Sequence, residues 1–209
     1  MLLAIDVGNT ETVVGLFADD PGDGHAATGD LGRSGAGGPA GAAHHDGSEP
    51  TGLAHHWRLS TVAERTADEH ALLLTQLLDL DGLDVATAVT GIAVTSSVPL
   101  VTANLRQMVL RWFDVPSVVL EPGVRSGMPI LYDNPKEVGA DRIANAIGAY
   151  DLYGGPCIVV DLGTATTFDA ISEKGEYLGG AIAPGIAISM DALFHHAAAL
   201  RRVELVEPR

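Results

Sequence analysis

The chain has 209 residues, 46% of them hydrophobic, which is enough to build the core of one large domain or two small lobes. Its formal net charge of −15 excludes the basic surface that a nucleic-acid backbone requires, so we expect no nucleic-acid partner. A single cysteine, Cys157, excludes an internal disulfide and a cysteine-based zinc site, and indicates a reducing compartment.

The N-terminal residues do not have the pattern of a signal peptide. They lack a basic segment, and the acidic Asp6 interrupts the apolar run almost at once. No apolar stretch approaches the length that spans a membrane. We therefore expect a cytoplasmic protein without a membrane partner.

The first predicted elements are two strands joined by a tight turn. Residues 2–7 (LLAIDV) have the composition of a buried strand, and residues 11–18 (ETVVGLFA) that of a second strand. Gly8-Asn9-Thr10 between them is a typical hairpin turn.

A low-complexity segment follows at residues 19–53, where 10 of the 25 glycines fall. It has almost no large apolar side chain, so it cannot bury enough surface to offset its ordering entropy, and we expect a disordered insert. Five of the eight histidines lie in or beside it. A metal-binding tract is one interpretation, but a solvated loop is favoured because the histidines follow no ligand spacing. These histidines are His25, His44, His45, His55 and His56.

Beyond the insert, predicted strands alternate with predicted helices, which indicates an α/β fold. The predicted strands cover residues 56–60, 90–98, 116–120, 157–162, 166–172 and 177–183, and the predicted helices cover residues 66–80, 99–112, 137–153 and 185–200.

One motif occurs twice at the end of a hydrophobic strand. Residues 6–10 (DVGNT) and 161–166 (DLGTAT) share an aspartate, a glycine two positions later, and then small polar residues. A duplicated unit would place the two turns face to face across a cleft.

The first turn has the chemistry of a phosphate-binding loop. Gly8 lets the backbone approach a phosphate, and Asn9 and Thr10 add side-chain donors. Asp6 is suited to a hydrated magnesium ion, which takes few carboxylates. An ordinary hairpin turn is the alternative interpretation.

The second turn strengthens this interpretation because it also contains a glycine and is rich in hydroxyl groups. The two turns together resemble the phosphate loops of the acetate and sugar kinase, heat-shock ATPase and actin superfamily. Gly179-Gly180 and Pro184-Gly185 resemble the loop on the nucleoside side in that superfamily, although a plain turn and helix start fits them as well.

The block Gly139-Ala140-Asp141-Arg142 opens a predicted helix. Asp141 could accept a hydroxyl proton, and Arg142 could pair with a substrate carboxylate, unless the two form only a surface pair. Five segments in order resemble type III pantothenate kinase, and the resemblance covers the chain except the insert. They are DVGNTETVVG, TSSVP, NPKEVGADRIAN, DLGTATTFD and GGAIAPG.

The resemblance implies transfer of phosphate from ATP to pantothenate, which is the first step of coenzyme A biosynthesis. It implies duplicated ribonuclease H-like (actin-like ATPase) lobes with mixed sheets flanked by helices, and a homodimer. The first lobe would cover residues 1–125 and the second residues 126–209. The chain ends at Arg209, before a segment with a pantothenate-contacting threonine that family members carry, so we expect the second lobe to be incomplete.

The resemblance also implies site residues. Asp141 would be the catalytic base and Asp161 the ligand of potassium or ammonium, while Asp6 is the magnesium candidate on its own chemistry. The residues implied to contact ATP are Asp6, Val7, Gly8, Asn9, Thr10, Glu11, Thr12, Val13 and Thr164. Those implied to bind pantothenate are Tyr132, Gly139, Ala140, Asp141 and Arg142.

Two other functions are compatible with the same motifs. A small sugar kinase of the superfamily would turn over hexoses, although the short chain and the Gly-Ala-Asp-Arg block argue against it. A regulatory relative without turnover would be expected to lose Asp141 or Asp161, and both are present.

Overall fold

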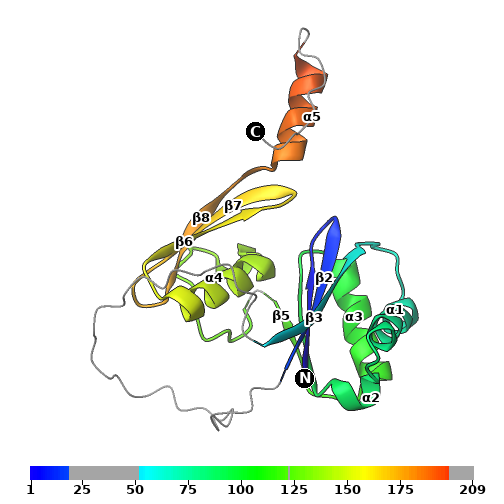
Figure 1. The fold of residues 1–209 in the computed structure, drawn as a ribbon. Coiled ribbons are helices and arrows are strands. Elements are labelled where there is room, and N and C mark those ends of the chain that lie inside the picture. Colours follow the sequence, from blue (N-terminus) through cyan, green and yellow to red (C-terminus); the bar gives the residue numbers. More distant parts are fainter. Residues whose placement is uncertain (19–51, 122, 198–209) are drawn as a thin grey trace, which may run out of the picture.

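The computed structural model describes residues 1–18, 52–121 and 123–197, which form two β-sheets with helices packed against them (Figure 1). The first sheet has the strand order β3-β2-β1-β4-β5. β1 is antiparallel to β2 and parallel to β4, so this sheet is mixed. Its strands are β1 (Leu2–Val7), β2 (Glu11–Phe17), β3 (Leu53–Ser60), β4 (Gly91–Ser96) and β5 (Ser117–Leu120).

Two helices, α1 (Ala67–Leu80) and α3 (Pro99–Trp112), lie together on one side of this sheet (Figure 1). The first begins at a capping box, in which Thr66 Oγ1 accepts from the Glu69 amide at 3.3 Å and Glu69 accepts from the Thr66 amide at 2.8 Å. Pro99 occupies the first turn of the second, where its missing N–H costs nothing. The short helix α2 (Val85–Ala88) follows α1.

The second sheet is antiparallel throughout, with the order β6-β7-β8. It repeats the antiparallel order of β1, β2 and β3, as the repeated motif predicts. Helix α4 packs against β6 and β7 and also reaches β4 of the first sheet. The elements of this part are β6 (Cys157–Leu162), β7 (Ala165–Ile171), β8 (Tyr177–Pro184), the 3-10 turn η1 (Pro135–Glu137), α4 (Ala140–Tyr153) and α5 (Ile186–His196).

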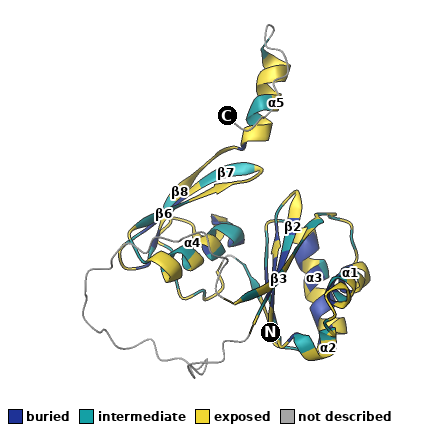
Figure 2. Ribbon diagram, viewed as in Figure 1, coloured by how far each residue is buried: buried dark blue, intermediate teal, exposed yellow. Residues whose placement is uncertain are grey.

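Helix α5 extends beyond the end of β8, and none of its residues is buried (Figures 1 and 2). Figure 2 shows the contrast with the first sheet, whose interior strands and helices carry most of the buried positions. Within the part of the chain that the structure describes, every helix is too short or too polar to cross a membrane.

The predicted α/β class is confirmed, and most predicted strands match within two residues. The predicted helix 137–153 begins later, at Ala140, because η1 and Gly139 precede it. The last helix ends at His196 in place of residue 200, with Ala197 as its C-terminal cap, and residues 198–200 lie outside the described residues. Helix α2 was not predicted.

The predicted end of the insert at residue 53 is wrong, because β3 already begins at Leu53 and pairs with β2. His55 and His56 are therefore strand residues. His55 stacks on Trp57 with ring centres 5.9 Å apart, and its Nδ1 lies 3.1 Å from an Asp81 carboxylate oxygen. The rest of the predicted insert, with His25, His44 and His45, lies outside the described residues.

Candidate functional site

The two repeated turns meet in the structure. The hydroxyl oxygens of Thr10 and Thr164, which are 154 residues apart in sequence, lie 3.1 Å from each other. Each turn is closed by one backbone bond, from Gly8 N to Glu11 O at 2.9 Å and from Gly163 N to Ala165 O at 3.0 Å. The expectation that the motifs face each other is confirmed by this contact.

The first turn rests on Thr61, a residue that the sequence motifs did not indicate. Its amide donates to Thr10 O at 3.0 Å, and its hydroxyl donates to Gly8 O at 2.8 Å. The hydroxyl oxygen of the buried Thr12 lies 2.8 Å from the hydroxyl oxygen of Thr61. These bonds hold the first turn in place against Thr61.

Several residues implied to contact ATP turn their side chains elsewhere. Val7 is fully buried in the first core, and Glu11 forms an ion pair with Arg58 at 2.6 Å. In this turn, Val7, Glu11 and Thr12 can therefore offer a ligand only their backbone groups.

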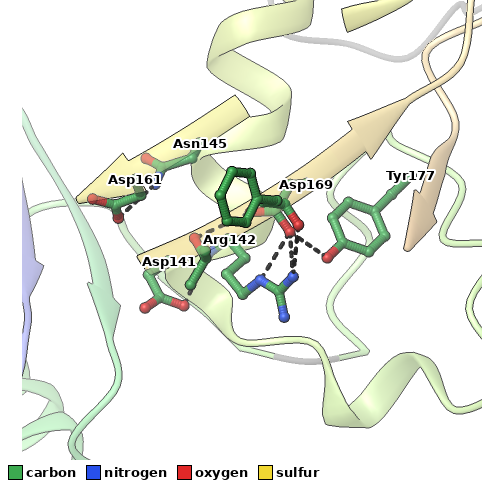
Figure 3. Close-up of polar contacts among 8 residues, drawn as sticks. Asp141, Arg142, Asn145, Asp161, Asp169 and Tyr177 are labelled. Atoms are coloured by element: carbon green, nitrogen blue, oxygen red, sulfur yellow. Dashed lines mark hydrogen bonds and ion pairs between the residues drawn. The ribbon is translucent and has the colours of Figure 1, made fainter. Parts of the chain in front are cut away.

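Three carboxylates from different elements face a common region near the turns. Asp6 ends β1, Asp141 lies in the first turn of α4, and Asp161 lies near the end of β6. Partial burial raises the pKa of Asp6, and the negative charges of Asp141 and Asp161 raise it further. Asn145, one turn along α4, donates to Asp161 Oδ2 at 3.3 Å (Figure 3).

The same carboxylates allow a test of whether the site fits a metal ion. No three His, Cys, Asp or Glu side chains within the described ranges come close enough to form a complete metal site. Magnesium fits this arrangement, since it binds through one or two carboxylates, keeps several waters and takes substrate phosphate oxygens.

The start of α4 determines how Asp141 lies. Its Oδ1 accepts from the Arg142 amide at 2.8 Å, so the carboxylate sits at the positive end of the helix. Gly139 caps the helix, and a Cβ at that position would collide with Asp141 Oδ1. Glycine is therefore required for this carboxylate orientation.

Arg142 points into a buried polar cluster (Figure 3). Its Nε and Nη2 donate to Asp169 Oδ1 at 2.8 Å and 2.6 Å, and the Asp169 side chain is completely buried. Tyr177 also donates to this oxygen, at 2.5 Å. Burial and the hydrogen bond to Asp169 raise the pKa of Tyr177, so its hydroxyl remains protonated. Sequence reasoning missed both residues, although an aspartate within the apolar β7 is a possible signal.

Gly179 and Gly180 of β8, with Tyr132 beside them, lie next to the same cluster. A Cβ at Gly179 would touch the Tyr132 ring at 3.5 Å, and one at Gly180 would collide with Arg142 Nη2. Gly179 and Gly180 thus lie within a strand beside Arg142 and not in the loop that the superfamily resemblance suggests. At Gly185 a Cβ would collide with the backbone of the second turn.

An apolar cavity of about 610 Å³ adjoins the carboxylates on the face of the first sheet toward α4. Asp6 and Thr95 are its polar lining groups nearest the strand ends, and they are partners in the β1–β4 register. The buried Thr95 hydroxyl has no hydrogen-bond partner among the described residues.

Comparison with known proteins identifies close relatives. The family model described as type III pantothenate kinase matches residues 42–209. The type III pantothenate kinase of Streptomyces griseus subsp. griseus is 50% identical over an alignment of 213 positions, which covers 100% of this chain and 69% of that protein. The one from Moorella thermoacetica is 50% identical over 208 residues, with the same shares. A solved structure described as a conserved putative Baf family transcriptional activator from Campylobacter jejuni aligns over 99% of this chain and 68% of its own, with 20% identity and a TM-score of 0.49.

Proposed function

Because this chain belongs to the type III pantothenate kinase family, we propose that its two joined turns and the Asp141–Arg142 pair form the site of pantothenate phosphorylation. The chain is a phosphotransferase that uses ATP to form 4'-phosphopantothenate, the first step of coenzyme A biosynthesis. The observation that carries the assignment of the site is the contact between the Thr10 and Thr164 hydroxyls.

The phosphates of ATP bind between the two turns. Residues 6–13 contribute mainly backbone N–H groups, with the side chains of Asn9 and Thr10, and Thr164 contributes from the opposite turn. Hydrogen-bond donors converging from two sides suit a triphosphate, because they neutralise its charge without a basic side chain. This also explains how a chain with a net charge of −15 can bind an anion.

The carboxylates hold cations. Asp6 would hold magnesium together with phosphate oxygens, and Asp161 would hold potassium or ammonium. These ions would supply neutralisation of the charge on the transferred phosphoryl group. Burial first, and then repulsion from Asp141 and Asp161, raise the pKa of Asp6, and bound cations would relieve that repulsion.

Asp141 takes the proton from the primary hydroxyl of pantothenate. Its Oδ1 already accepts from the Arg142 amide, which leaves Oδ2 available to receive the proton. Phosphoryl transfer is loose, and positioning therefore contributes more than covalent help. Arg142 binds the substrate carboxylate, and Gly139, Ala140 and Tyr132 line the same pocket.

The larger organisation is part of the proposal. Residues 1–125 and 126–209 act as two lobes, which two separate hydrophobic clusters support. A homodimer would cover apolar side chains that are exposed on the second sheet, including Ile158, Leu162 and Ile182.

One assay tests the proposal. Phosphopantothenate formation is measured with ATP and magnesium, in potassium or in sodium, with glucose as the control acceptor. We expect turnover of pantothenate only, faster in potassium, and no preference between the two ions in Asp161→Ala. Turnover of glucose would contradict the substrate, and equal wild-type rates in both salts would contradict the cation role of Asp161.

A further inference from the structure

We propose that Asp169 and Tyr177 are positioning residues that hold the guanidinium of Arg142 in the orientation that binds the substrate carboxylate. This role rests on the proposed function, in which Arg142 binds pantothenate. Neither residue touches the substrate. Both act through Arg142, from two strands of the second sheet.

The geometry at Asp169 is that of a fixed ion pair. Its side chain is completely buried and that of Arg142 is only 13% exposed. One oxygen, Oδ1, accepts from Nε, Nη2 and the Tyr177 hydroxyl. A buried carboxylate is costly unless it is paired and hydrogen-bonded, so the cluster holds together as a unit.

The backbone of β8 leaves the space that this guanidinium occupies. A Cβ at Gly180 would collide with Arg142 Nη2 and with Phe168 O, and would lie 2.9 Å from Asp169 Oδ1. Nη2 also donates to Phe168 O at 3.3 Å. Phe168 and Asp169 on β7 and Gly180 on β8 therefore form the surface against which one edge of the guanidinium packs.

These contacts determine which nitrogen of the Arg142 guanidinium remains available to a substrate. Asp169 engages the edge that carries Nε and Nη2, and Figure 3 shows the third nitrogen, Nη1, without a bond to the residues drawn. An arginine held in this way has already lost its rotamer freedom, so less entropy is lost when a carboxylate binds. The effect of Asp169 should appear in recognition of the substrate's negative charge.

The alternative is that Asp169 and Arg142 form only a structural ion pair. The two roles differ in selectivity, because a structural pair would stabilise the site equally for charged and neutral substrates. The primary amide of pantothenate is a suitable probe, since it matches the shape of the acid and lacks its charge.

The experiment compares kcat/KM for pantothenate and for its primary amide in wild type, Asp169→Asn and Tyr177→Phe. Loss of one charge-assisted contact corresponds to about 10- to 100-fold in binding. We expect the acid-to-amide ratio to fall roughly 10-fold or more in Asp169→Asn and roughly 3-fold in Tyr177→Phe, through KM for the acid, with kcat and KM for ATP nearly unchanged. Glu173→Gln, which neutralises an exposed acid in the adjacent turn, should keep the wild-type ratio.

The possible failures are distinguishable. If wild type phosphorylates neither compound, the proposed function is wrong and the positioning role falls with it. If wild type is active and a folded Asp169→Asn protein keeps the wild-type ratio, only the positioning role is overturned. If Asp169→Asn does not fold, Tyr177→Phe takes its place, because it keeps the Asp169–Arg142 ion pair and loses only the hydroxyl that donates to Asp169. An unchanged ratio in that variant then overturns the positioning role.

Discussion

The two sheets use the same strand-turn-strand unit but support it differently. Among the described residues, the first sheet and its helices share a cluster of 17 buried hydrophobic residues, whereas the cluster at the second sheet has five. Ile158, Leu162 and Ile182 of the second sheet are 70%, 68% and 66% exposed. The turn at Gly8 therefore rests on an apolar core, and the region around Gly163 relies more on the polar cluster at Asp169.

This difference suggests that stability and chemistry are largely separated. Asp141 and Arg142, to which we assign proton transfer and binding of the substrate carboxylate, lie on α4, while most of the buried apolar surface lies in the first sheet with α1 and α3. Substitutions in the two regions should therefore change different measurements, and the predictions below test that separation.

The largest effect is expected for Asp141→Asn, which removes the proposed base without changing its size. We expect kcat to fall about 10²- to 10⁴-fold, the range of general-base contributions, with the melting temperature nearly unchanged. The control is Asp151→Asn on the exposed far end of the same helix. Wild-type turnover in Asp141→Asn would exclude Asp141 as the base.

Next in size is Leu105→Ala in α3, where the side chain is 2% exposed. The lost burial and the resulting cavity should lower the free energy of unfolding by about 2–5 kcal/mol, measured by urea denaturation. Leu110→Ala, on the same helix but 82% exposed, should change it by less than about 0.5 kcal/mol. Similar losses in both variants would mean that α3 packs in solution through its other face.

The stability of the first sheet and its helices should also depend on pH through His70 in α1. Burial and, to a smaller extent, the charge of Arg65 lower its pKa to about 4, and the charge of Glu69 partly opposes them. The unfolded chain takes up a proton below about pH 6.5, while the folded chain resists protonation down to about pH 4. This contribution to stability is therefore fully present above pH 6.5 and is lost as the pH falls toward 4.

Between pH 6.5 and pH 4, the contribution of His70 to the free energy of unfolding should change by about 3 kcal/mol. Comparing unfolding free energies of wild type and His70→Leu between pH 7 and pH 4 isolates it from the titration of carboxylates. We expect a smaller loss of stability in His70→Leu on acidification, and parallel curves would show that His70 is protonated in the folded state.

The smallest effect is expected for Ile182→Thr on the exposed side of β8, when the single protomer is measured at a concentration below that at which the proposed homodimer forms. If this face is open to solvent, the free energy of unfolding should change by less than about 0.5 kcal/mol. A loss of 2 kcal/mol or more, by the scale of buried apolar substitutions, would show that the face is covered in solution and that the two sheets are more alike than their exposures indicate.

Much of the fold was predictable from local patterns in the sequence. The strand at residues 157–162 and the helix from Pro99 to Trp112 matched because an apolar run and a first-turn proline act over a few residues. The two turns and the Asp141–Arg142 pair were also found locally, since glycines and small polar residues mark a turn wherever the chain carries it. The sequence by itself determined the elements, the repeat and the candidate turns.

The contacts between these elements around the site became visible only in the tertiary structure. Strand pairing extended β3 back to Leu53 in a segment whose composition predicts a loop, because hydrogen bonding to β2 overrides local preference. Thr61 lies beneath a turn that is more than 50 residues away. Asp169 meets Arg142 across 27 residues, and in neither contact does the neighbouring sequence identify the partner residue. Such contacts depend on the pairing and packing of distant segments, so the surroundings of the site could be read only after the chain was folded.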